Sequence, residues 1–164
     1  MTDTHQESLN KLNDLIQEIG TGMLVTRDEQ GQLRSRPMQV ANEKLEDALY
    51  FFSDPNSAKI HELETNPQVN VSFACPDKQT YISISGSIHF IEDDAAKQKL
   101  WKDEFDRWCP KDLHAEDLVL IQVQMSQAEY WDVETSSMVQ LFGKAKSYMT
   151  GEDYTGAENK KLTI

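Results

Sequence analysis

The strongest constraint on the fold is a strict alternation of apolar and polar side chains in two neighbouring stretches. In "VNVSFA", Val69, Val71 and Phe73 alternate with polar or small residues, and "YISISGSIHF" repeats the pattern from Tyr81 onward. Side chains of a β-strand point to opposite faces with a period of two, so each stretch is predicted to be a strand buried on one face. We interpret both as half-buried antiparallel strands.

Other segments extend this pattern into a strand-rich domain. A hairpin is predicted in "GMLVTRDEQGQLRSRPMQV", with its turn at "DEQG", and further strands in "ALYFFS", "LVLIQVQM", "EYWDVE" and "MVQLFGKA". Helical spacing of apolar residues predicts a helix before Gly20, a second in "AKIHELETN" and a third from Asp94 to Phe105. Six or seven strands with short links favour a closed or nearly closed barrel, and hence a mainly β fold with flanking α-helices.

Length and composition limit the domain organisation. A chain of 164 residues suffices for one core and is short for two. We interpret residues 1–150 as a single domain. The polar segment 151–164, "GEDYTGAENKKLTI", is interpreted as a C-terminal tail with little fold of its own.

Charge excludes some classes of partner. The chain has 16 basic and 28 acidic residues and a net charge of −12, so neither nucleic acid nor an anionic membrane surface is expected to bind it. The N-terminus, "MTDTHQESLNKL", has neither the basic flank nor the apolar run of a signal peptide, and no stretch approaches the roughly 20 apolar residues of a membrane span. A cytoplasmic protein is therefore expected.

Several common catalytic motifs are absent from the sequence. It has no GxGxxG, no Walker-type loop and no HExxH, and its four histidines lack ligand spacing, so no metal site is predicted. The two cysteines, Cys75 and Cys109, have no CxxC spacing and are interpreted as reduced thiols without a redox role.

The stretch "FFSDPNSAK" places a lysine where a helix is expected to begin. Asp54 is a candidate cap and Pro55 a candidate first helical residue, which puts Ser57 and Lys59 in the opening turns. The positive end of a helix dipole prefers anions, so Lys59 there indicates a bound dianion held with Ser57 and free N–H groups. The alternatives are an ion pair of Lys59 with Glu62 or an extended, snorkelling side chain.

The stretch "RSRPM" adds a second basic feature. Arg34 and Arg36 lie on the same side of a predicted strand, and Pro37 removes a ladder donor, which favours a sheet edge or a position beside a ligand. Arg36 is thus a candidate to lie near the dianion. The alternative is that both arginines are solvated charges that pair with the many carboxylates.

Five stretches together resemble one known family. In order, they are "RSRPM", "YFFSDPNSAKIHELETNPQVNVSFA", "YISISG", "LWKDEFDRWCP" and "EYWD". They resemble the general stress protein branch of the pyridoxamine 5'-phosphate oxidase-like flavoproteins, the FMN-binding split β-barrels, over roughly residues 8 to 156. The resemblance implies a six-stranded antiparallel split β-barrel with flanking helices, a homodimer, and an FMN at each of two sites between subunits.

The resemblance also implies which residues contact FMN. Arg36, Pro37 and Met38 match the strand along the isoalloxazine ring, and Phe52 and Ser53 match the strand end beside it. Matches to phosphate ligands are found at Ser57 and Lys59. Trp131 matches the aromatic residue that the partner subunit brings to the flavin; the alternative is that Trp131 belongs to the barrel core.

Two departures from the oxidase proper bear on activity. Ala58 stands where the oxidase has a second basic residue, which weakens the phosphate site by one charge. The segment "DVETSSMVQLF" replaces the oxidase's substrate-binding segment, so oxidation of pyridoxamine phosphate is not expected.

The functional hypothesis is an FMN-dependent oxidoreductase that exchanges electrons with a small-molecule donor or acceptor. The flavin carries such chemistry, and a guanidinium near its pyrimidine end, here Arg36, stabilises the anionic reduced form. No general acid or base is identified in the sequence. The alternatives are a stress protein that binds or senses flavin without turnover, and a barrel without flavin.

Overall fold

The computed structural model describes residues 2–110, 113–132 and 158–163. Its strands are β1 Thr21–Arg27, β2 Leu33–Gln39, β3 Ala48–Ser53, β4 Gln68–Cys75, β5 Thr80–Ile91, β6 Val119–Asp132 and β7 Glu158–Thr163. The α-helices are α1 Thr2–Ile19, α2 Ala58–Thr65 and α3 Asp94–Leu100. Short 3-10 helices are η1 Pro76–Lys78, η2 Asp103–Arg107 and η3 Ala115–Asp117.

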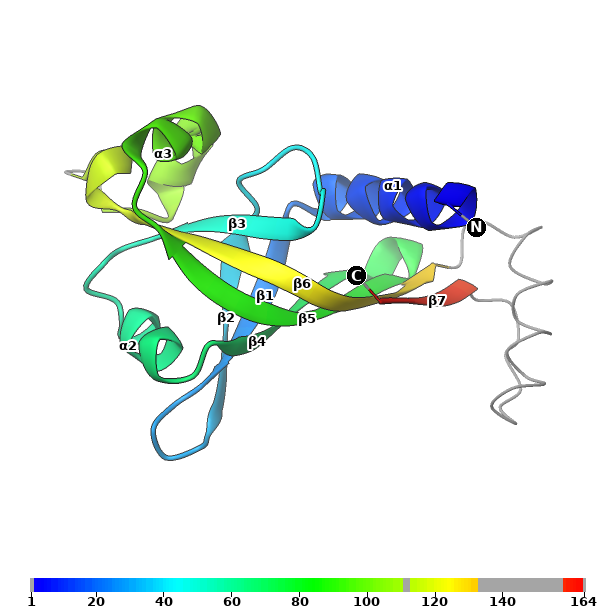
Figure 1. Ribbon diagram of the computed structural model, residues 1–164, viewed down its shortest axis with the longest axis horizontal. Helices are drawn as coiled ribbons and strands as arrows, with labels where there is room; N and C mark the ends of the chain where they lie inside the picture. Colours follow the sequence, from blue (N-terminus) through cyan, green and yellow to red (C-terminus); the bar gives the residue numbers. More distant parts are fainter. Residues whose placement is uncertain (1, 111–112, 133–157, 164) are drawn as a thin grey trace.

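The strands form one antiparallel sheet that curls into a half-barrel (Figure 1). Its order is β2-β1-β4-β5-β6-β3, and β7 pairs with β6 outside this path. Just after β2, the backbone N–H of Ala41 donates to the carbonyl of Tyr50 in β3 at 2.8 Å, which links the two end strands of the sheet. The predicted mainly β fold, a six-stranded antiparallel split barrel with flanking helices, is confirmed.

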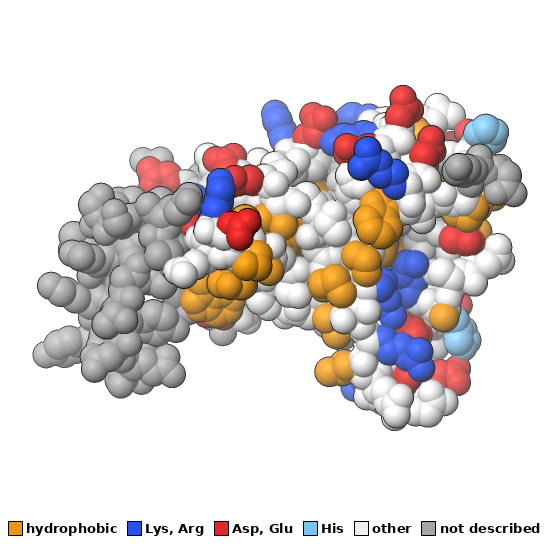
Figure 2. All heavy atoms as spheres, turned by 180° about the vertical axis from the view of Figure 1, so that it is seen from behind, with side chains coloured by type: hydrophobic (Ala, Val, Ile, Leu, Met, Phe, Trp, Pro, Cys, Tyr) orange, Lys and Arg blue, Asp and Glu red, His pale blue; other side chains and the backbone are white. Residues whose placement is uncertain are grey.

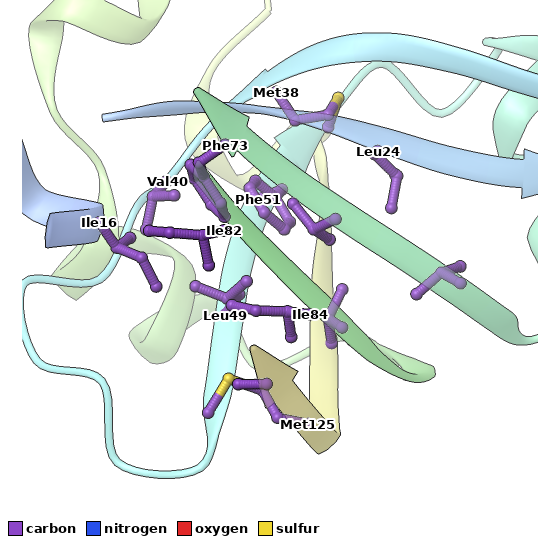
Figure 3. Close-up of a cluster of buried hydrophobic side chains, with 14 of the residues drawn as sticks. Ile16, Leu24, Met38, Val40, Leu49, Phe51, Phe73, Ile82, Ile84 and Met125 are labelled. Carbon is purple, nitrogen blue, oxygen red and sulfur yellow. The ribbon is translucent and has the colours of Figure 1, made fainter. Parts of the chain in front are cut away.

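The alternating strands bury one face, as predicted. Ile82 and Ile84 of β5 are at most 2% exposed, whereas Tyr81, whose side chain points to the opposite face of the strand from Ile82, is 43% exposed. The buried side chains of β1, β3, β4, β5 and β6 meet those of α1 inside the curled sheet (Figure 3). Burial of this continuous apolar cluster is the main source of stability for the barrel.

Helix α1 covers part of this core and ends where the sequence predicts. Leu12 and Ile16 are fully buried. Gly20 follows the helix at φ +74°, and its N–H donates to the carbonyl of Ile16 at 2.8 Å. Glycine adopts this left-handed backbone conformation without steric cost. It ends the helix, and the chain continues directly into β1.

The third predicted helix is shorter than expected. Helix α3 ends at Leu100, Trp101 is extended (φ −65°, ψ 138°), and a separate 3-10 helix, η2, follows. The ring of Trp101 packs edge-on against Phe52, with centroids 5.2 Å apart. This tertiary contact outweighs the local helical preference, so the prediction of one helix from Asp94 to Phe105 is wrong.

The C-terminal strands also differ from the prediction. The stretches "VLIQVQM" and "EYWD" belong to one continuous strand, β6, rather than to two. Residues Glu158–Thr163, expected to have little fold of their own, form β7 on Gln127–Asp132, whose backbone groups offer an edge for pairing. The predicted strand "MVQLFGKA" lies outside the described residues. No helix in the described ranges is long and apolar enough to cross a membrane.

A close approach between β5 and β6 depends on Gly86. The register shifts between Ser85 and Gly86, and Ser126 is left as the extra residue of a β-bulge on β6. A Cβ atom on residue 86 would lie 2.2 Å from the carbonyl oxygen of Gln124, a backbone atom that cannot move aside cheaply. Only glycine fits at this position.

We therefore predict that Gly86→Ala lowers the free energy of unfolding by about 1–3 kcal/mol or more, because the two strands must separate to admit the methyl group. Ser87→Ala, a change at the next residue of the same strand, should alter it by no more than about 0.5 kcal/mol. Urea unfolding of both variants measures the difference. Equal stability of the two variants would show that the strands part without strain.

Candidate functional site

The candidate site is a cleft of about 410 Å³ between β2, the end of β3, the start of α2 and the segment that includes η2. Its volume falls in the range of about 300–1,000 Å³ that small-molecule sites occupy. The lining residues are Pro37, Met38, Gln39, Phe52, Ser53, Asp54, Ser57, Lys59, Phe105, Arg107, Trp108, Cys109 and Pro110. On the face drawn in Figure 2, hydrophobic side chains form a broken column beside Lys and Arg side chains.

Most of the sequence-predicted site residues meet in this cleft. Pro37 and Met38 come from the edge strand β2, and Phe52 and Ser53 from the last residues of β3. Ser57 and Lys59 line the same cleft from the start of α2. Arg36 and Trp131 are not among its lining residues.

The turn before α2 differs in detail from the prediction. The carboxylate of Asp54 accepts a hydrogen bond from the N–H of Asn56 at 2.8 Å, and the Asp54 carbonyl accepts one from the N–H of Ser57 at 3.1 Å. Asp54 thus stabilises a turn through its own neighbours instead of capping the helix, and Pro55 lies in that turn. The helix begins at Ala58 with Ser57 as its N-cap residue, so the predicted roles of Asp54 and Pro55 are wrong.

Hydroxyl groups and one ammonium group gather at this helix start. Nζ of Lys59 donates to Oγ of Ser57 at 3.0 Å, and Oγ of Ser57 lies 3.2 Å from Oγ of Ser53. The Ser57 side chain makes no capping hydrogen bond, which leaves the first N–H groups of α2 without that acceptor. Polar donors therefore converge on one end of the cleft.

Lys59 is half-buried and has no ion-pair partner among the described residues. Burial, and then the nearby charge of Arg36, lower the pKa of Lys59 below its usual value, although Asp54 and Glu62 act against that shift. The expected alternative, an ion pair with Glu62, is not formed. An anion in the cleft would stabilise the charged form of this lysine.

Arg36 is held by hydrogen bonds to α2 and to β1. Its guanidinium donates to Oε2 of Glu62 at 2.9 Å and to Oγ1 of Thr26 at 2.5 Å. Thr26 in turn donates to Oε2 of Glu62 at 2.5 Å, and Arg34 lies 3.9 Å from the other carboxylate oxygen. In this structure the arginines of "RSRPM" pair with carboxylates, which is the alternative that the sequence left open.

This pairing joins the hairpin to the helix that carries the site. Glu62 is 7% exposed, and it lies on α2 one turn after Lys59. Its partners belong to β1 and β2. A buried carboxylate is stable only when charges and donors satisfy it, so the contact fixes α2 against the hairpin of β1 and β2.

The sequence did not identify the wall that η2 contributes. Phe105 is buried against Phe52 and Trp101, with ring centroids 5.7 Å from each, and the residues after it reach the cleft. The sequence does contain a feature that points to this wall: a basic residue, Arg107, stands beside Trp108 in a chain with an excess of acidic residues. Burial, followed by the charge of Asp106, raises the pKa of the neighbouring Cys109, so this thiol is not poised as a nucleophile.

Trp131 lies toward the end of β6 that is remote from the cleft. Its register partner on β5 is Tyr81, whereas the cleft end of β6 begins with Val119, which pairs with Ser53. The Trp131 side chain is partly exposed and does not belong to the buried core cluster of the described residues.

Comparison with known proteins gives one family. The family model described as "Pyridoxamine 5'-phosphate oxidase like" matches residues 7–155. The general stress protein 26 of Bacillus anthracis is 30% identical, with a TM-score of 0.61 over 73% of this chain and 92% of its own. A comparison with curated proteins finds no match.

Two other solved structures share the fold at lower identity. A Clostridium acetobutylicum protein related to general stress protein 26, of the pyridoxinephosphate oxidase family, has a TM-score of 0.70 and 16% identity, over 96% of this chain and 95% of its own. A protein named F420 reductase has a TM-score of 0.56 and 22% identity, over 71% of this chain and 94% of its own.

From the site geometry we predict that Glu62→Ala destabilises the protein by about 1.5–3 kcal/mol, because it removes the shared acceptor of Arg36 and Thr26. The matched control is Glu64→Ala on the same helix. Its carboxylate is exposed, and the contact that it makes with Nδ1 of His61 is long, at 3.7 Å. Chemical denaturation of both variants measures the effect. If Glu62→Ala costs no more than Glu64→Ala, the buried pairing does not hold α2 in place.

Proposed function

Because the chain belongs to the pyridoxamine 5'-phosphate oxidase-like family, we propose that it binds FMN in the cleft and acts as a flavin-dependent oxidoreductase on a small molecule. The observation that carries the proposal is Lys59, a half-buried lysine that has no carboxylate partner in the described chain and shares one end of a cleft with two serine hydroxyls. In a protein of net charge −12, such a cation is best explained by an anionic ligand.

The phosphate end of FMN fits this group of donors. In the proposal, Lys59 supplies charge, Ser57 a hydroxyl, and the first turn of α2 its N–H groups. Asp54, which also lines the cleft, is engaged by the N–H of Asn56. Ala58 is exposed and adds no charge, so the phosphate is bound with one basic residue fewer than the family resemblance leads one to expect.

The ring end of the ligand fits the apolar lining. Pro37 and Met38 from β2 and Phe52 from β3 line the cleft, and Ser53 adds a hydroxyl beside them. A bound flavin supplies the electron-transfer chemistry, while these side chains orient the ring and exclude water from one side of it. Arg36 acts in this proposal through its charge, since a direct ring contact requires its guanidinium to turn away from Glu62.

A second subunit completes the proposed site. Trp131 does not line the cleft of its own chain, and it stands beside Tyr81, a 43% exposed aromatic residue, in the β5–β6 register. An exposed tyrosine beside a partly exposed tryptophan on a sheet is typical of a surface that contacts another protein. We assign Trp131 to the flavin site of the partner in a homodimer, with a small-molecule electron donor or acceptor entering from solvent.

The first test is the visible spectrum of the purified protein, alone and after addition of FMN, riboflavin or F420. We expect flavin absorption and preferential binding of FMN. Anaerobic NADH or NADPH should then bleach the flavin. A yellow protein that no reductant bleaches would favour the non-catalytic flavin binder, and a protein that binds no FMN would overturn the proposal.

Lys59→Ala should weaken FMN binding by about 1–3 kcal/mol and leave riboflavin binding nearly unchanged, because the lost contact is with the phosphate alone. The matched control is Lys99→Ala, an exposed lysine outside the cleft. Titration calorimetry with both ligands measures the two affinities. Equal losses for FMN and riboflavin would place the phosphate elsewhere.

The FMN-saturated protein should sediment at twice the monomer mass, and added FMN should raise the thermal unfolding midpoint in a manner that depends on protein concentration. Trp131→Ala should weaken both FMN and riboflavin binding. Analytical ultracentrifugation of the wild type is decisive: a monomer that holds one FMN per chain rules out the shared site and the role of Trp131.

A further inference from the structure

We propose that Trp108 forms an aromatic platform on which the flat ring of the bound cofactor stacks. The subunit that binds the phosphate would then also contact the ring. The inference rests on the proposed function and deepens it. It assigns a binding role to a segment, Phe105–Pro110, to which the sequence assigned none.

Exposure singles out this tryptophan. The exposed large hydrophobic side chains in the described part of the chain are Met23, Leu33, Tyr81 and Trp108. Of these, only Trp108 lines the cleft, and it is 60% exposed there. An indole left this open is costly in water and becomes favourable when a planar ring covers it.

The backbone beneath Trp108 is fixed. Phe105 is 3% exposed, and its ring lies 5.7 Å from that of Phe52, which itself lines the cleft. The carbonyl of Phe105 accepts hydrogen bonds from the N–H of Trp108 at 2.9 Å and of Cys109 at 3.2 Å. The platform is therefore held in a tight turn on a buried anchor, which reduces the entropy lost on binding.

The rest of the cleft defines the class of ligand. Lys59 and Ser57 line it from α2, whereas Trp108 lines it from the η2 segment, and Pro37 and Met38 provide apolar surface from β2. Arg107 adds a positive charge next to Trp108. A planar ring joined to an anionic tail satisfies both parts at once, and neither a simple anion nor a purely apolar molecule does.

The test compares Trp108→Ala and Trp108→Phe with a matched control, Leu33→Ala, which removes an exposed apolar side chain of β2 outside the cleft. Trp108→Ala should raise the Kd for FMN and for riboflavin alike, by about 5- to 150-fold, the range that loss of aromatic stacking produces. Trp108→Phe should recover most of that loss, and Leu33→Ala should bind both ligands as the wild type does.

A spectroscopic readout separates stacking from a structural role. An indole in contact with a flavin quenches its fluorescence by electron transfer, and Trp131 is also assigned to a flavin site, so the comparison uses a Trp131→Phe parent. Flavin bound to the double variant Trp108→Phe, Trp131→Phe should fluoresce more strongly than flavin bound to Trp131→Phe alone. This measurement decides the question even if Trp108→Ala does not fold. Unchanged affinity in Trp108→Ala, or unchanged flavin fluorescence on adding Trp108→Phe to the Trp131→Phe parent, overturns the platform.

Failure of this inference is distinguishable from failure of the proposed function. If the wild type binds FMN and each Trp108 variant binds and fluoresces as its parent protein does, only the platform is refuted. If the wild type binds no FMN, both proposals fall together. If Trp108→Ala loses FMN because its dimer dissociates on sedimentation, Trp108 is a subunit contact and the platform is likewise overturned.

Discussion

The backbone pairing between β5 and β6 is the interaction on which the other elements depend. It runs from Tyr81–Trp131 at one end to Ile91–Leu120 at the other. β4 attaches to the free side of β5, and β3 to that of β6. The position of Ser53 in the cleft is therefore set by its partner Val119 on the same long strand. The close contact at Gly86 lets this pairing continue through a bulge. The strands attached to β5 and those attached to β6 therefore both depend on the absence of a side chain at this residue.

Much of this fold could be predicted from local sequence, because burial imposes a period on strands. Ile82 and Ile84 of β5 show that period, and Gly20 marks the end of α1. What could not be predicted depends on contacts between distant segments. The packing of Trp101 on Phe52 ends α3 early, and the pairing of β7 with β6 is decided by an edge that no local pattern reveals.

The same distinction applies to the candidate site. Ser57 and Lys59 were predicted because they are neighbours in the chain and their chemistry is unusual at a helix start. Trp108 was missed because a 3-10 segment has no apolar period and reaches the cleft only through Phe105. The partner of Arg36 also required the structure, since Glu62 becomes buried only when α2 lies against the hairpin. Taken alone, the charge of this arginine favoured pairing with carboxylates, and only its combination with Lys59 favoured a ligand.

Strands β3 and β7 occupy the same edge of β6 one after the other. β3 pairs with Val119–Gln124, and β7 pairs with Gln127–Asp132, so that only the bulge around Met125 and Ser126 separates them. Because they share one side of one strand, β7 shields the part of that edge that β3 does not reach. A protein without β7 would expose a row of unpaired backbone groups beside Trp131, and such a row is a template for pairing with strands of other chains. By pairing with this part of β6, the C-terminal strand removes one edge at which aggregation could begin.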